Sequence, residues 1–332
     1  MARRVVLHIG AMKSGTSYLQ GLVLANRDLL AEQGVKVPGK NWRAQVLAVS
    51  EVLERKRVTT RREGAWRALV DEFAEWDGAG LVSMEFLGPA APAKIERVVS
   101  SFPDGSVDVV VTARDLGRNV PAMWQEGLKN GRTWTFEEYV AAVAADEGPG
   151  KLFWREQGIA AMCRRWSEAV GVDRVTVVTV PPPGGPRDEL WRRFASVLEV
   201  DGSRVELPDS GNESLGAASA EVMRRLNELV EDLDYSAYSP VMKNMLAKRT
   251  LGPRGQVEQS VGFEVPDWLR TRSAQMAGRL TELGVHVVGD LAELEPVSTP
   301  GVDPGSMDGG EPLDAALAGL EGLVRALVRR GG

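Results

Sequence analysis

The chain has 332 residues, 43% of them hydrophobic and 26% charged, which suits one globular domain with appendages. Its net charge of −6 gives no overall basic field, so nucleic acid is not an expected partner. One cysteine excludes an internal disulfide and favours a cytoplasmic location, and two histidines argue against a zinc cluster. No apolar run is long enough to predict a membrane span.

Predicted strands and helices alternate along most of the chain. Short runs rich in Val, Leu and Ile predict strands, and apolar residues spaced by three and four predict helices. The strands are expected at 3–9, 78–85, 106–113, 173–180 and 284–290. The helices are expected at 16–34, 42–56, 61–76, 91–102, 117–131, 135–145, 155–170, 187–199, 215–233 and 266–283.

This alternation indicates a three-layer α/β fold with a mostly parallel sheet flanked by helices. Sheets of this kind bind ligands in the crevice at the carboxyl ends of their strands. Gly10, Glu85 and Arg114 each lie at the end of a predicted strand. We therefore expect three distant segments to converge on one site.

The last part of the chain has a different composition. Residues 296–312, PVSTPGVDPGSMDGGEP, are typical of a flexible linker, and residues 313–332 follow as an amphipathic helix. We therefore expect an α/β domain over 1–295, then the linker and the helix. The helix pattern fits either loose docking on its own domain or docking of a partner, including a second copy of the chain.

The segment HIGAMKSGTSYLQ, residues 8–20, indicates a phosphate-binding loop. Gly10 and Gly15 have the spacing of a Walker A loop, but Thr16 stands where that loop has lysine, and Lys13 lies inside the loop. Glycine still permits close backbone approach, and the first amides of the next helix favour an anion. We therefore expect a phosphate-like group bound without an essential metal.

These residues resemble a known family. GAMKSGTSYL is similar to the 5′-phosphosulfate loop of sulfotransferases that use 3′-phosphoadenosine 5′-phosphosulfate (PAPS), where the pattern is K-[ST]-G-[ST]-[ST]. The family's second motif is a strand ending in arginine, with a serine eight residues later that helps to bind the 3′-phosphate. VDVVVTARDLGRNVPAMWQE supplies the strand and Arg114, with Ala122 at the serine position and Arg118 and Asn119 as nearby polar residues. NESLG at 212–216 and GVHVVGDLAEL at 284–294 also resemble sulfotransferases of actinobacterial type.

The resemblance implies a P-loop NTPase-like sulfotransferase architecture over about residues 3–295. Lys13 would neutralise charge on the leaving nucleotide. The 5′-phosphate would be bound by Ser14, Gly15, Thr16 and Ser17, with Tyr18 placed either against the adenine or inside the helix packing. Arg114 and the position of Ala122 would face the 3′-phosphate. The acceptor would be a hydroxyl or amine of a small metabolite or glycan, and the product would be 3′-phosphoadenosine 5′-phosphate (PAP).

The acceptor also needs a base. Glu85 ends an apolar strand, where a carboxylate is partly desolvated and suited to proton transfer, although it could instead only orient a neighbour. His8 fits a core histidine better than a base, and Gln125 and Glu126 are weaker candidates. Two other functions stay open: a P-loop kinase or other phosphotransferase, and a non-catalytic relative that only binds nucleotide.

Overall fold

The computed structural model describes residues 2–55, 63–206 and 214–331, and the chain divides into two compact units. Unit 1 comprises residues 1–116, 154–209 and 270–295, and unit 2 comprises residues 117–153, 210–269 and 296–332. The domain expected over 1–295 is therefore shared between the two units. Some residues with sequence-based expectations lie outside the described ones: residues 56 and 61–62 of two expected helices, and residues 212–213 of NESLG.

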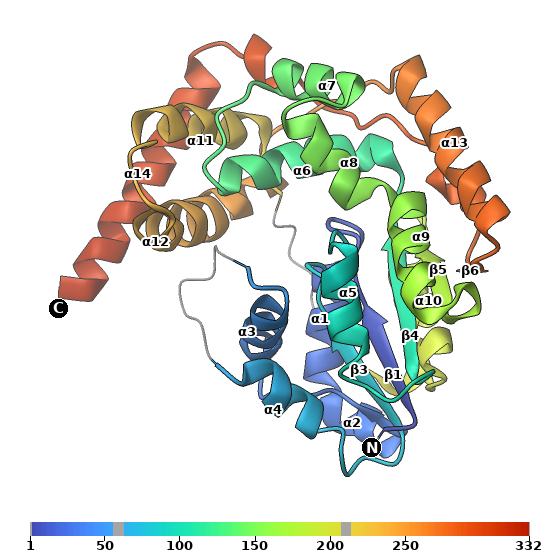
Figure 1. Cartoon of the computed structure of the whole chain (residues 1–332). Coiled ribbons are helices and arrows are strands. Elements are labelled where there is room, and N and C mark those ends of the chain that lie inside the picture. Colours follow the sequence, from blue (N-terminus) through green and yellow to red (C-terminus); the bar gives the residue numbers. More distant parts are fainter. Residues whose placement is uncertain (1, 56–62, 207–213, 332) are drawn as a thin grey trace. The chain divides into compact units, whose positions relative to one another are not determined.

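In the described residues, unit 1 contains a six-stranded sheet in the order β2-β3-β1-β4-β5-β6, with every neighbouring pair parallel (Figure 1). The strands are β1 (Arg4–His8), β2 (Val35–Lys36), β3 (Ala79–Ser83), β4 (Val107–Ala113), β5 (Val175–Thr179) and β6 (His286–Val288). The prediction of an α/β fold with a parallel sheet is confirmed. The sequence does not predict β2, because two residues are too few to give a strand pattern.

Helices cover both faces of this sheet, which makes unit 1 three layers deep. On one face lie α1 (Thr16–Ala25), α2 (Arg27–Glu32) and α10 (Glu189–Leu198), and on the other lie α5 (Pro92–Val99) and α9 (Ile159–Val170). The first face is held by one apolar cluster that includes Val6, Leu81, Val110, Leu19, Leu22, Trp191 and Phe194. Cys163 on α9 is buried, and burial raises the pKa of its thiol to about 12, as expected for a packing residue.

Two expected helices are each divided in the structure. The helix expected at 16–34 breaks at Asn26, whose side-chain amide donates to the carbonyls of Leu22 at 2.9 Å and Glu206 at 3.0 Å. The helix expected at 155–170 breaks at Gly158, between α8 (Pro149–Gln157) and α9. A Cβ at Gly158 would lie 2.5 Å from the carbonyl oxygen of Trp154, so this break requires glycine.

The other unit 1 helices are α3 (Trp42–Val52), α4 (Ala65–Asp71) and most of α13 (Asp267–Leu283), with short turns η1 (Val172–Arg174), η2 (Gly202–Arg204) and η5 (Leu291–Leu294).

The described part of unit 2 is mainly helical. It contains α6 (Leu116–Lys129), α7 (Phe136–Ala145), most of α8, α11 (Ala217–Leu229), α12 (Tyr235–Tyr238), the π-helix η3 (Ser239–Leu251), η4 (Gly252–Gln256), η6 (Pro304–Ser306) and α14 (Gly310–Gly331). The segment expected as a linker has fixed partners: Phe263 and Thr299 exchange backbone hydrogen bonds of 2.9 and 3.0 Å, and Gly262 donates to Val302 at 2.9 Å. No helix in the described residues is both long enough and apolar enough to cross a membrane.

Candidate functional site

The loop between β1 and α1 has the backbone of an anion-binding turn. Gly10, Lys13 and Gly15 have φ of 115°, 59° and 80°, all in the left-handed region. Gly15 is the N-cap of α1 and has no side chain that could cap the helix. The first helical hydrogen bond is donated by the amide of Leu19 to the carbonyl of Gly15 at 3.0 Å. The amides of the first turn therefore point out of the helix without a capping side chain. Amides in this position bind anions, and the helix dipole adds to the attraction.

The strand next to β1 brings Glu85 to this loop. His8 pairs with Ser83, and the amide of Met84 donates to the carbonyl of His8 at 2.9 Å, so the pairing continues beyond β3. A Cβ added to Gly10 would lie 3.4 Å from the Cα of Glu85. Glu85 itself is half-buried. The sequence-predicted convergence of Gly10 and Glu85 is thus present in the structure.

Gln20 on α1 holds the carboxylate of Glu85 in place. Its Nε2 donates to Glu85 Oε2 at 2.9 Å and to the carbonyl of Ser83 at 3.2 Å. Its Oε1 accepts from the indole Nε1 of Trp42 at 3.1 Å. An indole nitrogen can only donate, so this bond fixes which end of the amide faces Glu85. The buried Gln20 side chain therefore has one orientation, with both amide protons directed at oxygens.

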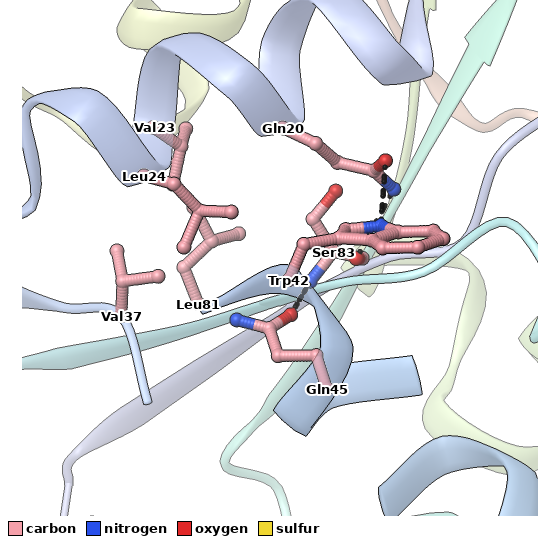
Figure 2. A pocket seen from close by; sticks show the side chains of 8 residues that line it. All are labelled: Gln20, Val23, Leu24, Val37, Trp42, Gln45, Leu81 and Ser83. Atoms are coloured by element: carbon pink, nitrogen blue, oxygen red, sulfur yellow. Dashed lines mark hydrogen bonds between the residues drawn. The ribbon is translucent and has the colours of Figure 1, made fainter. Parts of the chain in front are cut away.

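Trp42 and Gln20 also line a small pocket, which Figure 2 shows with the indole of Trp42 beside the Gln20 amide. The pocket contains about 220 Å³ of space, including the part open to solvent, and its walls are Gln20, Val23, Leu24, Val37, Trp42, Gln45, Leu81 and Ser83. Its enclosed part has room for about one water molecule.

The strand on the other side of β1 brings Arg114 to the same edge of the sheet. The carbonyl of Gly10 accepts from the amide of Thr112 at 2.6 Å and from its hydroxyl at 3.0 Å, and Ala11 donates to the Thr112 carbonyl at 2.8 Å. Arg114 follows two residues after Thr112 and is half-buried. The loop thus lies between the segments that contain Glu85 and Arg114, as expected for residues at the carboxyl ends of neighbouring parallel strands.

His8 lies beneath the loop and has no exposed surface. One ring nitrogen is 2.7 Å from the Ser83 hydroxyl and the other is 3.2 Å from the Thr112 hydroxyl. Burial lowers the pKa of His8 to about 3, so the ring is neutral at neutral pH. Its two bonds link the three central strands below the site, which agrees with the core role expected for it.

The remaining loop side chains differ in exposure. Ser14 and Thr16 are buried, Ser17 is exposed, and Lys13 and Tyr18 are half-buried. Tyr18 packs against the apolar cluster of α1 and α10, and burial, followed by the charge of Asp188, raises its pKa. This packing accounts for the Tyr18 ring without a ligand, and contact with adenine stays a prediction.

Other sequence candidates lie in unit 2. On α6, Asn119 is buried, and Arg118 and Ala122 are half-buried. The role of Ala122 toward a 3′-phosphate stays a prediction. Gln125 exchanges hydrogen bonds with the backbone of Leu215 at 3.0 and 3.2 Å. Glu126 accepts from Asn130 at 2.9 Å and pairs with Lys243 at 3.3 Å. These contacts give the two weaker base candidates structural roles.

Sequence reasoning did not identify Gln20 or Trp42. Gln20 is a polar residue on the apolar face of the helix after the loop, and this pattern could have identified it. Buried polar side chains are normally held by specific hydrogen bonds. Trp42 has no comparable signal, because its partner lies 22 residues earlier in the chain.

No family model matches the chain, and no curated protein matches it in sequence. Among solved structures, a sulfotransferase from Alicyclobacillus acidocaldarius matches with a TM-score of 0.42 and 18% identity, over 72% of this chain and 99% of that chain.

Gly15 is also required by its contact with α10. A Cβ there would lie 2.3 Å from Leu190 Cδ2. The helix α10 is fixed at this end by Arg193, which donates to the Thr179 carbonyl at 2.9 Å and to Glu293 at 2.9 Å. The bond from Arg193 holds the pKa of Glu293 below its usual value. Leu190 is therefore on a helix with little freedom to move away.

We predict that Gly15→Ala destabilises the protein by about 2 kcal/mol or more, since left-handed backbone costs alanine about 1–2 kcal/mol before the clash is counted. Gly21→Ala is the matched control, because Gly21 is inside α1 and a Cβ there meets nothing within 4 Å. That change should stabilise the helix by up to about 1 kcal/mol. Urea unfolding measures both, and equal stability of the two variants would contradict the assigned loop geometry.

Proposed function

We propose that the chain is a sulfotransferase that moves a sulfuryl group from PAPS to a hydroxyl or amine of a small metabolite or glycan, without a metal ion. The observation that carries this proposal is the placement of the Lys13 loop between Glu85 and the segment of Arg114. Transfer of a group from an anionic donor requires an anion-binding turn, a carboxylate and an arginine. The donor set of the loop fits a phosphosulfate, because amides, hydroxyls and one lysine all favour an anion.

Each residue has a defined task in this proposal. When bound, PAPS supplies an activated sulfuryl group. The first amides of α1, with Thr16 and Ser17, would hold the 5′-phosphate, and Lys13 would neutralise the charge that grows on the leaving oxygen. Arg114 would bind a phosphate through charge-assisted hydrogen bonds. In-line transfer through a loose transition state needs positioning and charge stabilisation more than covalent chemistry from the protein.

Glu85 would accept the proton of the acceptor group. Its Oε2 already accepts from Gln20, which orients the carboxylate beside the loop. A base must lie within hydrogen-bond reach of the proton that it removes, and a fixed carboxylate meets that requirement better than a mobile one. Gln20 is thus a positioning residue for Glu85.

A P-loop kinase is the main alternative. It would use the same loop for nucleotide phosphates, but its lysine normally follows the second glycine, where this chain has Thr16. Lys13 inside the loop favours the sulfuryl donor. The non-catalytic alternative shares the same nucleotide site and differs only in turnover.

Nucleotide binding tests the proposal directly. PAP should raise the melting temperature equally with and without a chelator, because a ligand that binds only the folded state stabilises it. Adenosine 5′-diphosphate, which lacks the 3′-phosphate, should stabilise the protein less. Stabilisation by ATP with magnesium, and none by PAP, would overturn the proposal in favour of a kinase.

We predict that Lys13→Ala lowers the rate of sulfuryl transfer by at least about a hundred-fold and weakens PAP binding by less than about ten-fold. The lysine charge acts mainly where charge develops in the transition state. Labelled PAPS with a panel of hydroxyl and amine acceptors measures the rate, and calorimetry measures PAP affinity. Lys248→Ala, on an exposed lysine of η3, is the control. A Lys13→Ala rate equal to that of the control would remove the catalytic role.

We predict that Gln20→Leu lowers kcat by about ten-fold while PAP affinity stays within about two-fold, because the hydrogen bond that orients Glu85 is lost. Gln45→Leu is the matched control. Gln45 lines the same pocket and is equally buried, but it bonds to the backbone of Ser83 at 3.1 Å and Pro38 at 3.1 Å. Both variants should lose stability from unpaired buried groups. A similar fall in kcat for both would show that Gln20 acts only through stability.

A further inference from the structure

The helix α14 packs on unit 2 through its smallest residues. Ala315 has no exposed surface, and a Cβ at Gly319 would lie 3.0 Å from Leu246 on η3. A Cβ at Gly322 would lie 2.3 Å from Thr250 on the same element. The helix contacts both η3 and α11, and Figure 1 shows it beside α11. Alanine and glycine thus make the contact that large apolar residues make in an ordinary terminal helix.

Most of the large apolar residues of α14 face outward instead, and Leu323 is half-buried. Six of them have between 50% and 70% of their surface exposed: Leu313, Leu317, Leu320, Val324, Leu327 and Val328. The first five follow one another at steps of four, three, four and three residues. That is the seam of a coiled coil, which pairs with a second helix. A contiguous exposed apolar surface of this kind marks an interaction site.

The charges along α14 indicate which partner fits. The first half of the helix contains Glu311 and Asp314, Glu321 lies at its middle, and the second half contains Arg325 and Arg329. Within one helix, Arg325 forms an ion pair with Glu321, with 2.7 Å between Nη2 and Oε1. A second copy running in the opposite direction would place the acidic half of each helix beside the basic half of the other. A parallel copy would place like charges together, which disfavours that orientation.

We propose that the chain forms a homodimer through the outer faces of two antiparallel α14 helices. A two-fold axis near the middle of the apolar seam makes the interface self-complementary, as a two-fold dimer requires. The acidic residues beside the seam disfavour a membrane surface as its partner, because helices that lie on membranes carry mainly Lys and Arg there. The proposal is independent of the sulfotransferase assignment.

Sedimentation equilibrium of the full chain tests the dimer. The wild type should have about twice the monomer mass of 36.0 kDa at micromolar concentration, and the double variant Leu317→Glu, Val324→Glu should have the monomer mass. Leu229→Glu is the matched control, because Leu229 on α11 is 77% exposed in the same unit and should leave the dimer intact. Circular dichroism checks that the double variant is folded. A monomeric wild type would overturn the proposal.

Disulfide cross-linking tests the direction of pairing. Two separately tagged variants, Leu313→Cys and Leu327→Cys, should form a mixed disulfide with each other faster than either forms one with itself. The natural Cys163 is buried and does not compete. Predominant self-linking of each variant would overturn the antiparallel arrangement. Binding to phosphatidylglycerol vesicles by a monomeric wild type, abolished by the double variant, would assign the face to a membrane instead.

Discussion

The candidate site depends on the hydrogen bonds that continue the sheet beyond the end of β1. Gly10 and Ala11 bond to Thr112 on one side, and His8 accepts from Met84 on the other. Because these bonds follow the parallel register, they place the residues after β3 and β4 beside the loop. A slip of one residue would turn each of these side chains to the opposite face of the sheet.

The proposed function requires an acidic protein to bind a strongly negative ligand, and the loop offers positive character for it. Its positive character is local, since it comes from backbone amides, a helix dipole and Lys13 rather than from the net charge of −6. Lys13 has a φ of 59°, a conformation that costs most residues other than glycine about 1 kcal/mol or more. We interpret this local strain as the cost of turning the lysine within a short loop.

Much of the fold and the main parts of the site follow from sequence pattern, and the rest depends on packing. Runs such as VDVVVTA predict a buried strand, and strand ends predict where Glu85 and the loop meet. The Gln20–Trp42 bond joins two helices whose separation is set by side-chain packing, so no local pattern contains it. The partners of 296–312 are equally non-local, because Phe263 and Thr299 pair across 36 positions. Composition alone therefore indicated a linker.

The contact between Gln20 and Glu85 has a chemical consequence for any reaction at this site. A lysine or arginine in place of Gln20 would also orient the carboxylate, but its charge would hold Glu85 in an ion pair and oppose protonation. A neutral amide gives direction through its hydrogen bond and leaves the carboxylate its charge. The same amide is held by Trp42, so its orientation does not depend on Glu85 alone. The direction of the carboxylate is thus set through neutral partners.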